Sequence, residues 1–519
     1  MKNKQLGLLV LIAFVVKTAM ALTVELNNDE VYYWTYAQQL QLNYFDHPPG
    51  IALLLRLGTF NLFFQQEFFL RLGSMLCSAI SVWLIYLIGK RVKNERAGFI
   101  AALLFTASPY CSIIAGWLVI PDAPQLMFWL WSVLLMLKAI EPLQRTQKMR
   151  RRLLMIGVAI GCCTLCKVHG IFLWLGFFSY VLFYQRKILK DQFLFYSGFI
   201  TVILISPIIY WNVLNNFITY RYHSSRVSFF SAIHPDAILR EFTGEIIYSN
   251  PVSFAILILV LVTVFRKQRF MPLSSQRLLL LVSFPLIITV LFISLFRDTL
   301  PHWTGPAYAT LIPLMSAYLA EKQIVTKELR VPAPVKWAIG FTIVLLVPAF
   351  ITVKFLPVNI GKKDALHLGE GDPTLDMNGF KQFGVQFDSL YRHDVKEGLM
   401  GQRPFLIADC WFPAAHIDYY VARPNELSFL AIGDLKAIHH YAWLNQSRTF
   451  LAPGNDAYFI TVSNYFNPPS PALTSQFGQL SAPVMVTQYR SGIAVRHFII
   501  YRLRNYKGNI PGNGVLTNN

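Results

Sequence analysis

Long apolar runs alternate with short polar segments over the first 355 residues of the chain. A membrane-spanning helix needs about 20 mostly apolar residues. Eleven runs approach or reach that length, at residues 6–24, 68–89, 97–116, 123–140, 153–168, 170–184, 193–211, 251–265, 277–296, 306–320 and 337–355. The pattern predicts a polytopic α-helical membrane protein with about 11 transmembrane helices. The fifth and sixth runs are short, and the alternative is that they form one tight helical hairpin.

Lys and Arg residues gather in alternate loops. The tail and the segments 90–96, 138–152, 186–190, 266–277 and 322–336 hold 23 of them, and the opposite loops before residue 337 hold five. By the positive-inside rule, the N-terminus is cytoplasmic and the segment after the last span lies outside.

The first run also resembles a cleaved signal peptide with a basic start. Because Lys17 interrupts its apolar core, we expect an uncleaved anchor.

Composition supports the membrane assignment. Hydrophobic residues make up 55% of the chain and charged residues 14%, against about 25% charged in a typical soluble domain. The formal net charge of +19 would suggest a nucleic-acid partner if the protein were soluble. Here the excess lies in the predicted cytoplasmic loops. It is therefore an orientation signal, and the expected contact is membrane lipid, with no nucleic acid.

Two interfacial helices are predicted in the first outer loop, residues 25–67. Asn28 is the expected N-cap of the first, with Asp29 and Glu30 in its first turn. The second begins at Pro48–Pro49. A later outer loop, residues 212–250, contains an amphipathic stretch that Pro235 can start, with Ile238, Leu239, Phe242, Ile246 and Ile247 on one side.

The composition changes near residue 356. Strand-like runs at 404–408, 458–462 and 498–501 alternate with helix-like segments around 413–421 and 433–445. About 160 residues suffice for one small α/β domain. We therefore predict two domains, a transmembrane domain at 1–355 and an external α/β domain at 356–519.

Several ionisable residues are expected at the outer mouth of the spans: Asp29, Glu30, Asp46, His47, Asp122, Lys167, His169, Arg297 and His302. This mixture of acids and cations suits the transfer of a group away from a phosphate. A carboxylate would take the proton of an acceptor hydroxyl. Basic residues, with or without a divalent metal, would neutralise the departing phosphate. No nucleotide-binding fingerprint is present in the sequence.

The motifs Asn28–Trp34 and Tyr44–Pro49 closely resemble the first outer loop of GT-C glycosyltransferases. The resemblance is to the bacterial branch related to protein O-mannosyltransferases and the lipid A aminoarabinose transferase. Further motifs occur in the family's order, namely Phe69–Gly73, Pro121–Pro124, Cys166–Gly170 and Pro301–Pro306. The ordered set covers about residues 25–320. The C-terminal domain resembles the family only in being an external α/β appendage.

This resemblance implies a membrane enzyme that uses a polyprenyl-phosphate-linked sugar and inverts the anomeric carbon. Asp29 falls on the acid that activates the acceptor and Asp122 on a second active-site acid. Asp46 falls on an acid that contacts a divalent metal in related enzymes, the identity of the metal being open. The residues implied against the donor phosphate are His47, which replaces a Lys of some members, the basic pair Lys167 and His169, and additionally Arg71, Tyr44, Arg297 and His302.

Most of these residues also have a structural alternative. Glu30, which we count among the catalytic candidates, could only favour the helix N-terminus, and Asp122 could only cap its span. Asp46 and His47 could shape the turn before Pro48–Pro49. The remaining alternatives are interfacial or intrahelical roles, by snorkelling or ion pairing, for Lys167, His169, Arg71, Arg297 and His302.

The sequence thus predicts a glycosyltransferase of the bacterial inner membrane with a periplasmic active site. It would transfer a sugar from a polyprenyl phosphate to lipopolysaccharide, another glycolipid or a protein. The chief alternative is a transporter or flippase for a lipid-linked sugar, which would place its charged residues near the middle of the membrane. A third reading is an envelope scaffold whose external domain binds a partner.

Overall fold

The computed structural model describes residues 2–140, 146–225, 233–322 and 330–516. The chain forms two compact units. One, the helical unit, comprises Met1–Met20 and Gln41–Leu346, and the other, the sheet unit, comprises Ala21–Leu40 and Val347–Asn519. The predicted division lay at residues 355–356. The structure divides the chain within the last long helix and adds residues 21–40 to the sheet unit. Of the charges used for orientation, Arg145, Arg226 and Lys327 lie outside the described residues.

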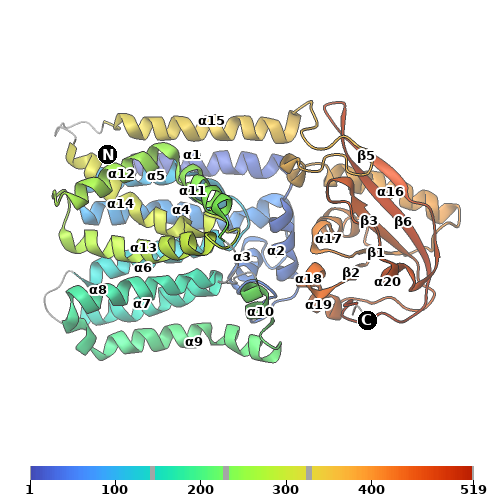
Figure 1. Cartoon of the computed structure of the whole chain (residues 1–519), viewed down its shortest axis with the longest axis horizontal. Coiled ribbons are helices and arrows are strands. Elements are labelled where there is room, and N and C mark those ends of the chain that lie inside the picture. The colour runs from blue at the N-terminus through green and yellow to red at the C-terminus, as the bar shows by residue number, and fades with distance from the viewer. Residues whose placement is uncertain (1, 141–145, 226–232, 323–329, 517–519) are drawn as a thin grey trace. The chain divides into compact units, whose positions relative to one another are not determined.

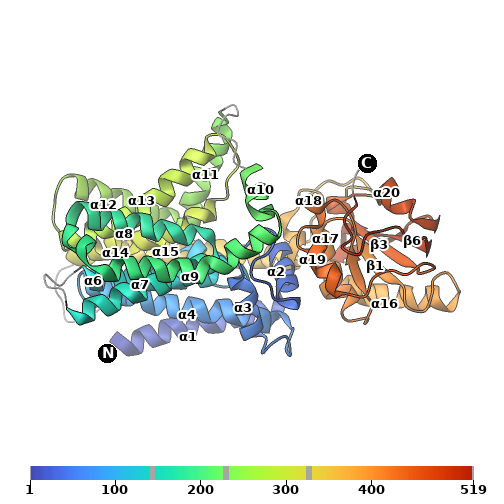
Figure 2. The same ribbon diagram turned by 90° about the horizontal axis from the view of Figure 1, so that it is seen from below.

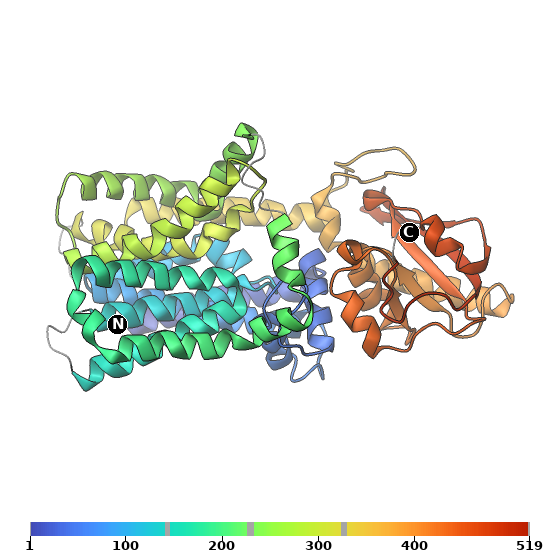
Figure 3. The same ribbon diagram turned by 60° about the horizontal axis from the view of Figure 1, so that its bottom comes forward.

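Helices that run alongside one another build the helical unit (Figures 1 and 3). Each predicted apolar run falls on a helix. The helices are α1 (Lys2–Thr23), α3 (Gly50–Gly58), α4 (Glu67–Val92), α5 (Glu95–Thr106), α6 (Asp122–Ala139), α7 (Gln147–Cys166), α8 (Phe172–Tyr184), α9 (Gln192–Leu214), α10 (Ile218–Ser225), α11 (Pro235–Ser249), α12 (Pro251–Phe265), α13 (Leu273–Ser294), α14 (Gly305–Lys322) and α15 (Ala333–Phe355). Short turns of 3₁₀ or π-helix, η1 (Tyr110–Ile114), η2 (Val168–Ile171) and η4 (Pro301–Thr304), lie next to them.

Among the described residues, five helices are long and apolar enough to cross a membrane: α1, α4, α9, α13 and α15. The pair α11 and α12 would add a sixth span if counted together. The polytopic helical class is therefore confirmed, while the total of about 11 stays a prediction. The predicted span 97–116 is interrupted. Its helix α5 ends at Thr106, and Pro109, which lacks an amide hydrogen, precedes η1.

A sharp bend of 99° separates α11 from α12, and Figure 2 shows α11 inclined to the neighbouring helices. Asn250 makes the bend with a left-handed φ of 76°. Its side-chain oxygen accepts from the amides of Val252 and Ser253, which caps α12. Its side-chain Nδ2 donates to the carbonyl oxygens of Ala107 and Ala338 at 2.9 and 2.8 Å. The bend is thus pinned to two other parts of the bundle.

A mixed sheet forms the centre of the sheet unit. Its strands are β1 (Phe405–Ala408), β2 (Phe429–Ala431), β3 (Ala457–Val462), β4 (Phe477–Leu480), β5 (Val484–Arg490) and β6 (Ile493–Tyr506). The order is β2-β1-β3-β6-β4, with β5 also paired to β6. The first three strands are parallel, and β6 is antiparallel to its partners. The predicted strands within β1, β3 and β6 are confirmed, and the others were not predicted.

Short helices complete this unit. They are α2 (Asn28–Gln38), α16 (Phe380–Lys396), α17 (Trp411–Ile417) with the π-helical turn η6 (Asp418–Ala422), α18 (Leu435–Ile438), α19 (Tyr441–Leu444) and α20 (Pro471–Thr474). On one sheet face, Phe383 of α16 stacks on Phe498 of β6 with centroids 3.8 Å apart. Phe459 and Leu503 belong to a second cluster on the other face, with Leu473 of α20. Alternate residues of β3 and β6 therefore serve two small cores.

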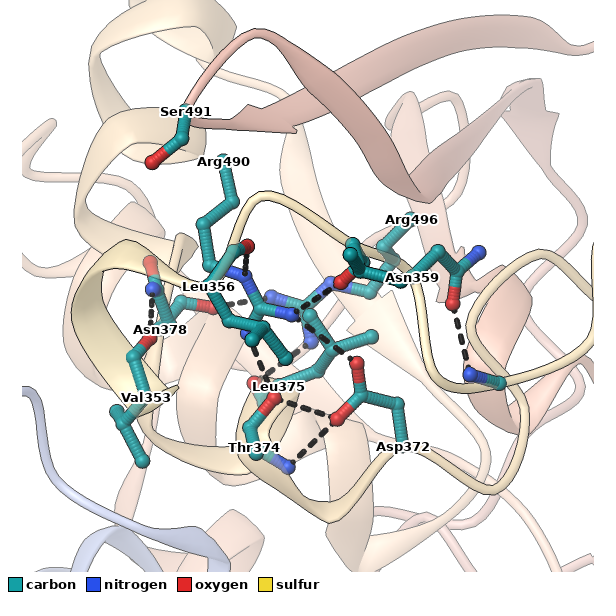
Figure 4. Close-up of polar contacts among 12 residues, drawn as sticks. Val353, Leu356, Asn359, Asp372, Thr374, Leu375, Asn378, Arg490, Ser491 and Arg496 are labelled. Atoms are coloured by element: carbon teal, nitrogen blue, oxygen red, sulfur yellow. Dashed lines mark hydrogen bonds and ion pairs between the residues drawn. The ribbon is translucent and has the colours of Figure 1, made fainter. Parts of the chain in front are cut away.

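Two buried arginines tie the segment after α15 to the β5–β6 hairpin (Figure 4). Arg490 forms an ion pair with Asp372, with its Nη2 3.2 Å from Oδ2, and it donates to the carbonyl oxygen of Leu356 at 3.0 Å. Arg496 donates to the carbonyl oxygens of Leu375 and Asn378 at 3.2 and 2.7 Å. Because these cations are withdrawn from water, each hydrogen bond stabilises the packing of the segment against the hairpin.

Loss of the buried carboxylate should destabilise the sheet unit. We expect Asp372→Asn to lower the free energy of unfolding by about 3–5 kcal/mol, since it leaves the Arg490 charge buried without its partner. Asp388→Asn is the matched control, because the Arg392 side chain of the Asp388–Arg392 pair is exposed, and a surface ion pair of this kind contributes little to stability. Thermal unfolding of the full-length purified proteins, followed by circular dichroism, measures both. Equal losses in the two variants would contradict the assignment.

Candidate active site

A buried ion pair lies at the centre of the candidate site. The ammonium of Lys167 is 2.8 Å from Oδ2 of Asp122, and both side chains are at most 5% exposed. Asp122 is the first residue of α6, where an anion is favoured by the helix dipole. Lys167 follows the last residue of α7, and its amide caps that helix through the carbonyl oxygen of Cys163. Both charged side chains of the pair are therefore carried by residues at helix ends.

Tyr110 binds the second oxygen of Asp122. Its hydroxyl donates to Oδ1 at 3.2 Å, and the ring is buried. Tyr110 sits in η1, just beyond the break in the predicted span. Gly305 allows this placement, because a Cβ added there would lie 2.2 Å from the Tyr110 ring. The first residue of α14 and the start of α6 are thereby brought to the same aromatic side chain.

Three histidines lie close enough to this ion pair to interact with its charges. The charges of Asp122 and Lys167 act on His47, His169 and His302. The ring of His169 lies 5.8 Å from that of Trp303, next to His302 in η4. Nδ1 of His169 is buried and has no hydrogen-bond partner among the described residues. The structure therefore brings together five predicted site residues from four separate parts of the chain.

The imidazoles of His47 and His302 are neutral at pH 7. Desolvation lowers the pKa of His47 to about 4, and the Lys167 charge and a neighbouring imidazole oppose protonation further, while Asp46 and Asp122 favour it. Desolvation also lowers the pKa of His302 to about 4, with Lys167 acting in the same direction. As neutral rings they add no charge of their own, and Lys167 supplies the cationic charge of this cluster.

A tight turn holds His47 in this cluster. The Tyr44 amide donates to the His47 carbonyl at 3.1 Å, and the Tyr44 carbonyl accepts from Thr219 of α10. Nε2 of His223, also in α10, lies 2.8 Å from the carbonyl oxygen of Asp46. Gly50 then packs against α7, where an added Cβ would lie 2.8 Å from Cα of Cys166. These contacts place the turn beside the residue that precedes Lys167.

The candidate acids Asp29 and Glu30 belong to α2 in the sheet unit. Asn27, and not Asn28 as predicted, is the N-cap of this helix. The Asn27 side chain accepts from the Glu30 amide at 2.9 Å, and the Glu30 carboxylate accepts from the Asn27 amide at 3.0 Å. This capping box gives the buried Glu30 a structural role. Asp29 is exposed.

Comparisons with known proteins give a partial family match and a shared fold. The family model for dolichyl-phosphate-mannose-protein mannosyltransferases matches residues 46–211. The crystal structure of ArnT from Cupriavidus metallidurans bound to undecaprenyl phosphate has a TM-score of 0.62 and 14% identity, covering 96% of this chain and 98% of that chain. The apo structure of the same protein has a TM-score of 0.60 at the same identity and coverage. A search of curated proteins found no significant match.

The family model matches part of the chain, and the fold shared with ArnT extends over nearly all of it. The expected resemblance is confirmed, and the likeness extends through the sheet unit, since almost the full length of both chains is covered. Asp46, Asp122, Lys167 and His169 lie inside the matched range. Asp29, Arg297 and His302 lie outside it.

Three other predicted site residues have their own surroundings in the structure. The Arg71 guanidinium is fully buried and lies 4.1 Å from the centroid of the Trp117 ring. Nη1 of Arg297 is buried without a hydrogen-bond partner among the described residues. The hydroxyl of Tyr44 accepts from the Gln41 amide at 3.2 Å, so this side chain stabilises the turn. Phosphate-binding roles for these three residues stay predictions.

The residues around Asp46 do not form a metal site made by protein side chains alone. Within residues 2–140, 146–225, 233–322 and 330–516, no three His, Cys, Asp or Glu side chains gather where one ion could be held. The backbone carbonyl oxygen of Asp46 is already bound by the His223 ring. The divalent metal and Asp46 as its ligand stay predictions.

Four polar residues of the helical unit were not predicted from the sequence. Tyr110 lies in an apolar run predicted to be one continuous helix, and His223 has no motif around it. Glu241 and Glu245 of α11 are each 1% exposed, and they accept from Thr299 at 2.7 Å and from Tyr308 at 3.0 Å. Their spacing of four residues could have indicated one face of a helix.

The lowered histidine pKa values predict an acid-sensitive bundle. Between pH 6.5 and about 4 the unfolded chain binds protons that the folded His302 does not, so stability falls as the pH is lowered through this window. His302→Gln should lose less stability than the natural protein between pH 7.5 and 4.5. Thermal unfolding at the two pH values measures the difference. His234→Gln, at an exposed position, should leave the pH dependence unchanged, and an identical dependence in His302→Gln would contradict the prediction.

Proposed function

We propose that this GT-C chain transfers a sugar from a polyprenyl phosphate to an acceptor on a cell-envelope glycolipid or protein. The reaction would take place at the periplasmic face of a bacterial inner membrane. The observation that carries the proposal is the buried Asp122–Lys167 pair with three imidazoles around it, in a bundle of apolar helices. The ArnT structure with the same fold contains undecaprenyl phosphate, which supports a lipid phosphate as the ligand class.

The proposed reaction is a single displacement. The acceptor oxygen attacks the anomeric carbon from the side opposite the phosphate, and the carbon–oxygen bond to the phosphate breaks. The proton of the acceptor passes to Asp29, and the negative charge develops on the leaving phosphate. One displacement inverts the anomeric configuration.

Lys167 and the imidazoles would stabilise the leaving phosphate. Lys167 is held by Asp122, which orients its ammonium through a hydrogen bond of 2.8 Å. An anion next to His47 and His302 favours their protonated forms. Binding of the donor would therefore add positive charge where the reaction needs it. A cluster of this kind in a site withdrawn from water stabilises charge more strongly than the same groups do in water.

Removal of the proposed base should affect chemistry and leave folding intact. We expect Asp29→Asn to reach wild-type protein levels and to lower the transfer rate by roughly 10²–10⁴-fold, the usual contribution of general-base catalysis. Mass spectrometry of envelope lipids and glycoproteins, in cells with and without the gene, identifies the product and then measures its rate of formation. Near-wild-type transfer by Asp29→Asn would refute the assignment.

Glu30→Gln is the matched control for this experiment. It makes the same chemical change one residue further along α2, and glutamine at this position can still complete the capping box. We expect transfer within about twofold of the wild type. A loss as large as that of Asp29→Asn would show that the carboxylates act together or that the change disturbs the helix.

Removal of the Lys167 ammonium should weaken binding of the lipid phosphate. We expect Lys167→Met to bind undecaprenyl phosphate at least tenfold more weakly, since a charge-assisted hydrogen bond is worth about 1.5–3 kcal/mol. Lys190→Met, at an exposed position outside the cluster, is the control. Binding to the purified proteins in detergent measures both, and unchanged binding in Lys167→Met would contradict the phosphate role.

Transport of a lipid-linked sugar by reconstituted vesicles, without sugar transfer, would favour the flippase alternative.

A further inference from the structure

The segment that leads into α2 is held by the sheet unit at three points. The Phe380 amide donates to the Glu25 carboxylate at 2.9 Å. The Leu26 amide donates to the hydroxyl of Tyr420 at 2.8 Å. Nε2 of His416 lies 3.2 Å from the Leu26 carbonyl oxygen. Both backbone polar groups of Leu26 are thus bound by side chains of α17 and η6, three residues before Asp29.

His416 is itself fixed in position. It is fully buried, and its ring stacks on Phe380 with centroids 4.0 Å apart. Burial lowers the pKa of His416 to about 3, and the neighbouring Arg496 charge adds to this effect, so the ring is neutral at pH 7. Its Nδ1 has no hydrogen-bond partner among the described residues. Nε2 therefore carries the hydrogen that it shares between the carbonyl oxygens of Leu26 and Asp376.

Arg496, one of the two buried arginines labelled in Figure 4, supports the same stack. Its guanidinium lies 4.3 Å from the centroid of the Phe380 ring, and Phe380 in turn contacts both Glu25 and His416. Its Nε donates to Gln488 at 2.9 Å. The contacts therefore run continuously from the β5–β6 hairpin to the start of α2.

Aromatic contacts hold the body of α2 in the same unit. Tyr32 lies 5.0 Å from Trp411 of α17 between ring centroids, and Trp34 lies 5.2 Å from Tyr419 of η6. Tyr32 and Trp34 are each 2% exposed, whereas Asp29 on the same helix is exposed. Tyr32 and Trp34 lie on different sides of α2, so these ring contacts and the hydrogen bonds at the N-terminus together fix the helix both in rotation and along its axis.

We propose that the sheet unit positions Asp29 for catalysis, with Tyr420 and His416 as the positioning residues. This inference rests on the base role proposed above for Asp29. It gives the C-terminal unit a task in the reaction, beyond stabilising the chain. Displacement of a catalytic group by about 1 Å can lower the reaction rate roughly 100-fold. The hydrogen bonds of Tyr420 and His416 to Leu26, here called the clamp, would therefore control turnover without any contact with the substrate.

Tyr420→Phe tests the clamp, because it removes only the oxygen that accepts from the Leu26 amide. We expect the transfer rate to fall roughly tenfold, while binding of undecaprenyl phosphate by the purified protein stays within about twofold. Tyr458→Phe is the matched control. Its hydroxyl donates to Asp394 at 2.8 Å in another part of the same unit, and its loss should leave the transfer rate near that of the wild type. A loss in Tyr458→Phe as large as that in Tyr420→Phe would overturn the proposal.

The double variant with Asp29→Asn separates positioning from general destabilisation. If Tyr420 acts through Asp29, Tyr420→Phe should cause no further loss in the Asp29→Asn background. A tenfold loss in both backgrounds would overturn the positioning role. Full activity of Asp29→Asn alone would instead refute the proposed base, so the two failures are distinguishable.

A second variant covers the case that Tyr420→Phe does not fold. His416→Phe keeps an aromatic ring against Phe380 and removes the donor to the Leu26 carbonyl. It should show the same fall in rate, the same unchanged binding of undecaprenyl phosphate, and the same lack of additivity with Asp29→Asn. Wild-type transfer by a well-folded His416→Phe protein, or an additive loss in the double variant, would overturn the proposal.

Discussion

The ion pair between Asp122 and Lys167 is the interaction on which the helical unit's site depends. Two opposite charges withdrawn from water are tolerated only if they meet with good geometry and find further partners. Here Tyr110 satisfies the second carboxylate oxygen, and helix ends supply both charges. The neutral imidazoles of His47 and His302 then sit close to this pair without adding uncompensated charge. The paired charges of such a site nearly cancel, and a neighbouring anion would favour protonation of the imidazoles.

The division of the chain follows a different constraint. Residues 21–40 precede most of the bundle in sequence, yet they belong to the sheet unit. The aromatic side chains of α2 find their packing partners there, and Leu26 finds partners for both of its backbone polar groups. Buried polar groups need hydrogen bonds as much as aromatic rings need contact surface. The C-terminal unit is therefore tied by its own packing to a helix of the first outer loop.

Local pattern was a reliable guide where one environment surrounds a whole segment. Apolar runs predicted the positions of the long helices, and strands were predicted at β1, β3 and part of β6 because β1, β3 and residues 498–500 of β6 are buried throughout. It was less reliable where two environments meet. The apolar side chains of α11 were recognised, but Leu239 and Phe242 are 66% and 43% exposed, while Glu241 and Glu245 are buried. Next to a membrane, an apolar helix face can turn outward, and the acids can find hydroxyl partners inside.

The sequence by itself determined that the chain is a polytopic helical membrane protein with a C-terminal α/β unit. Its ordered motifs also supplied the acids and cations predicted for the site, because hydropathy and residue type are local properties. Only the tertiary structure decided which of them meet. It joined Asp122, Lys167 and three histidines, gave Glu30 a capping role, and assigned the helix of Asp29 to the sheet unit. These outcomes depend on close approaches at Gly50 and Gly305 and on hydrogen bonds between distant segments, which no local pattern encodes.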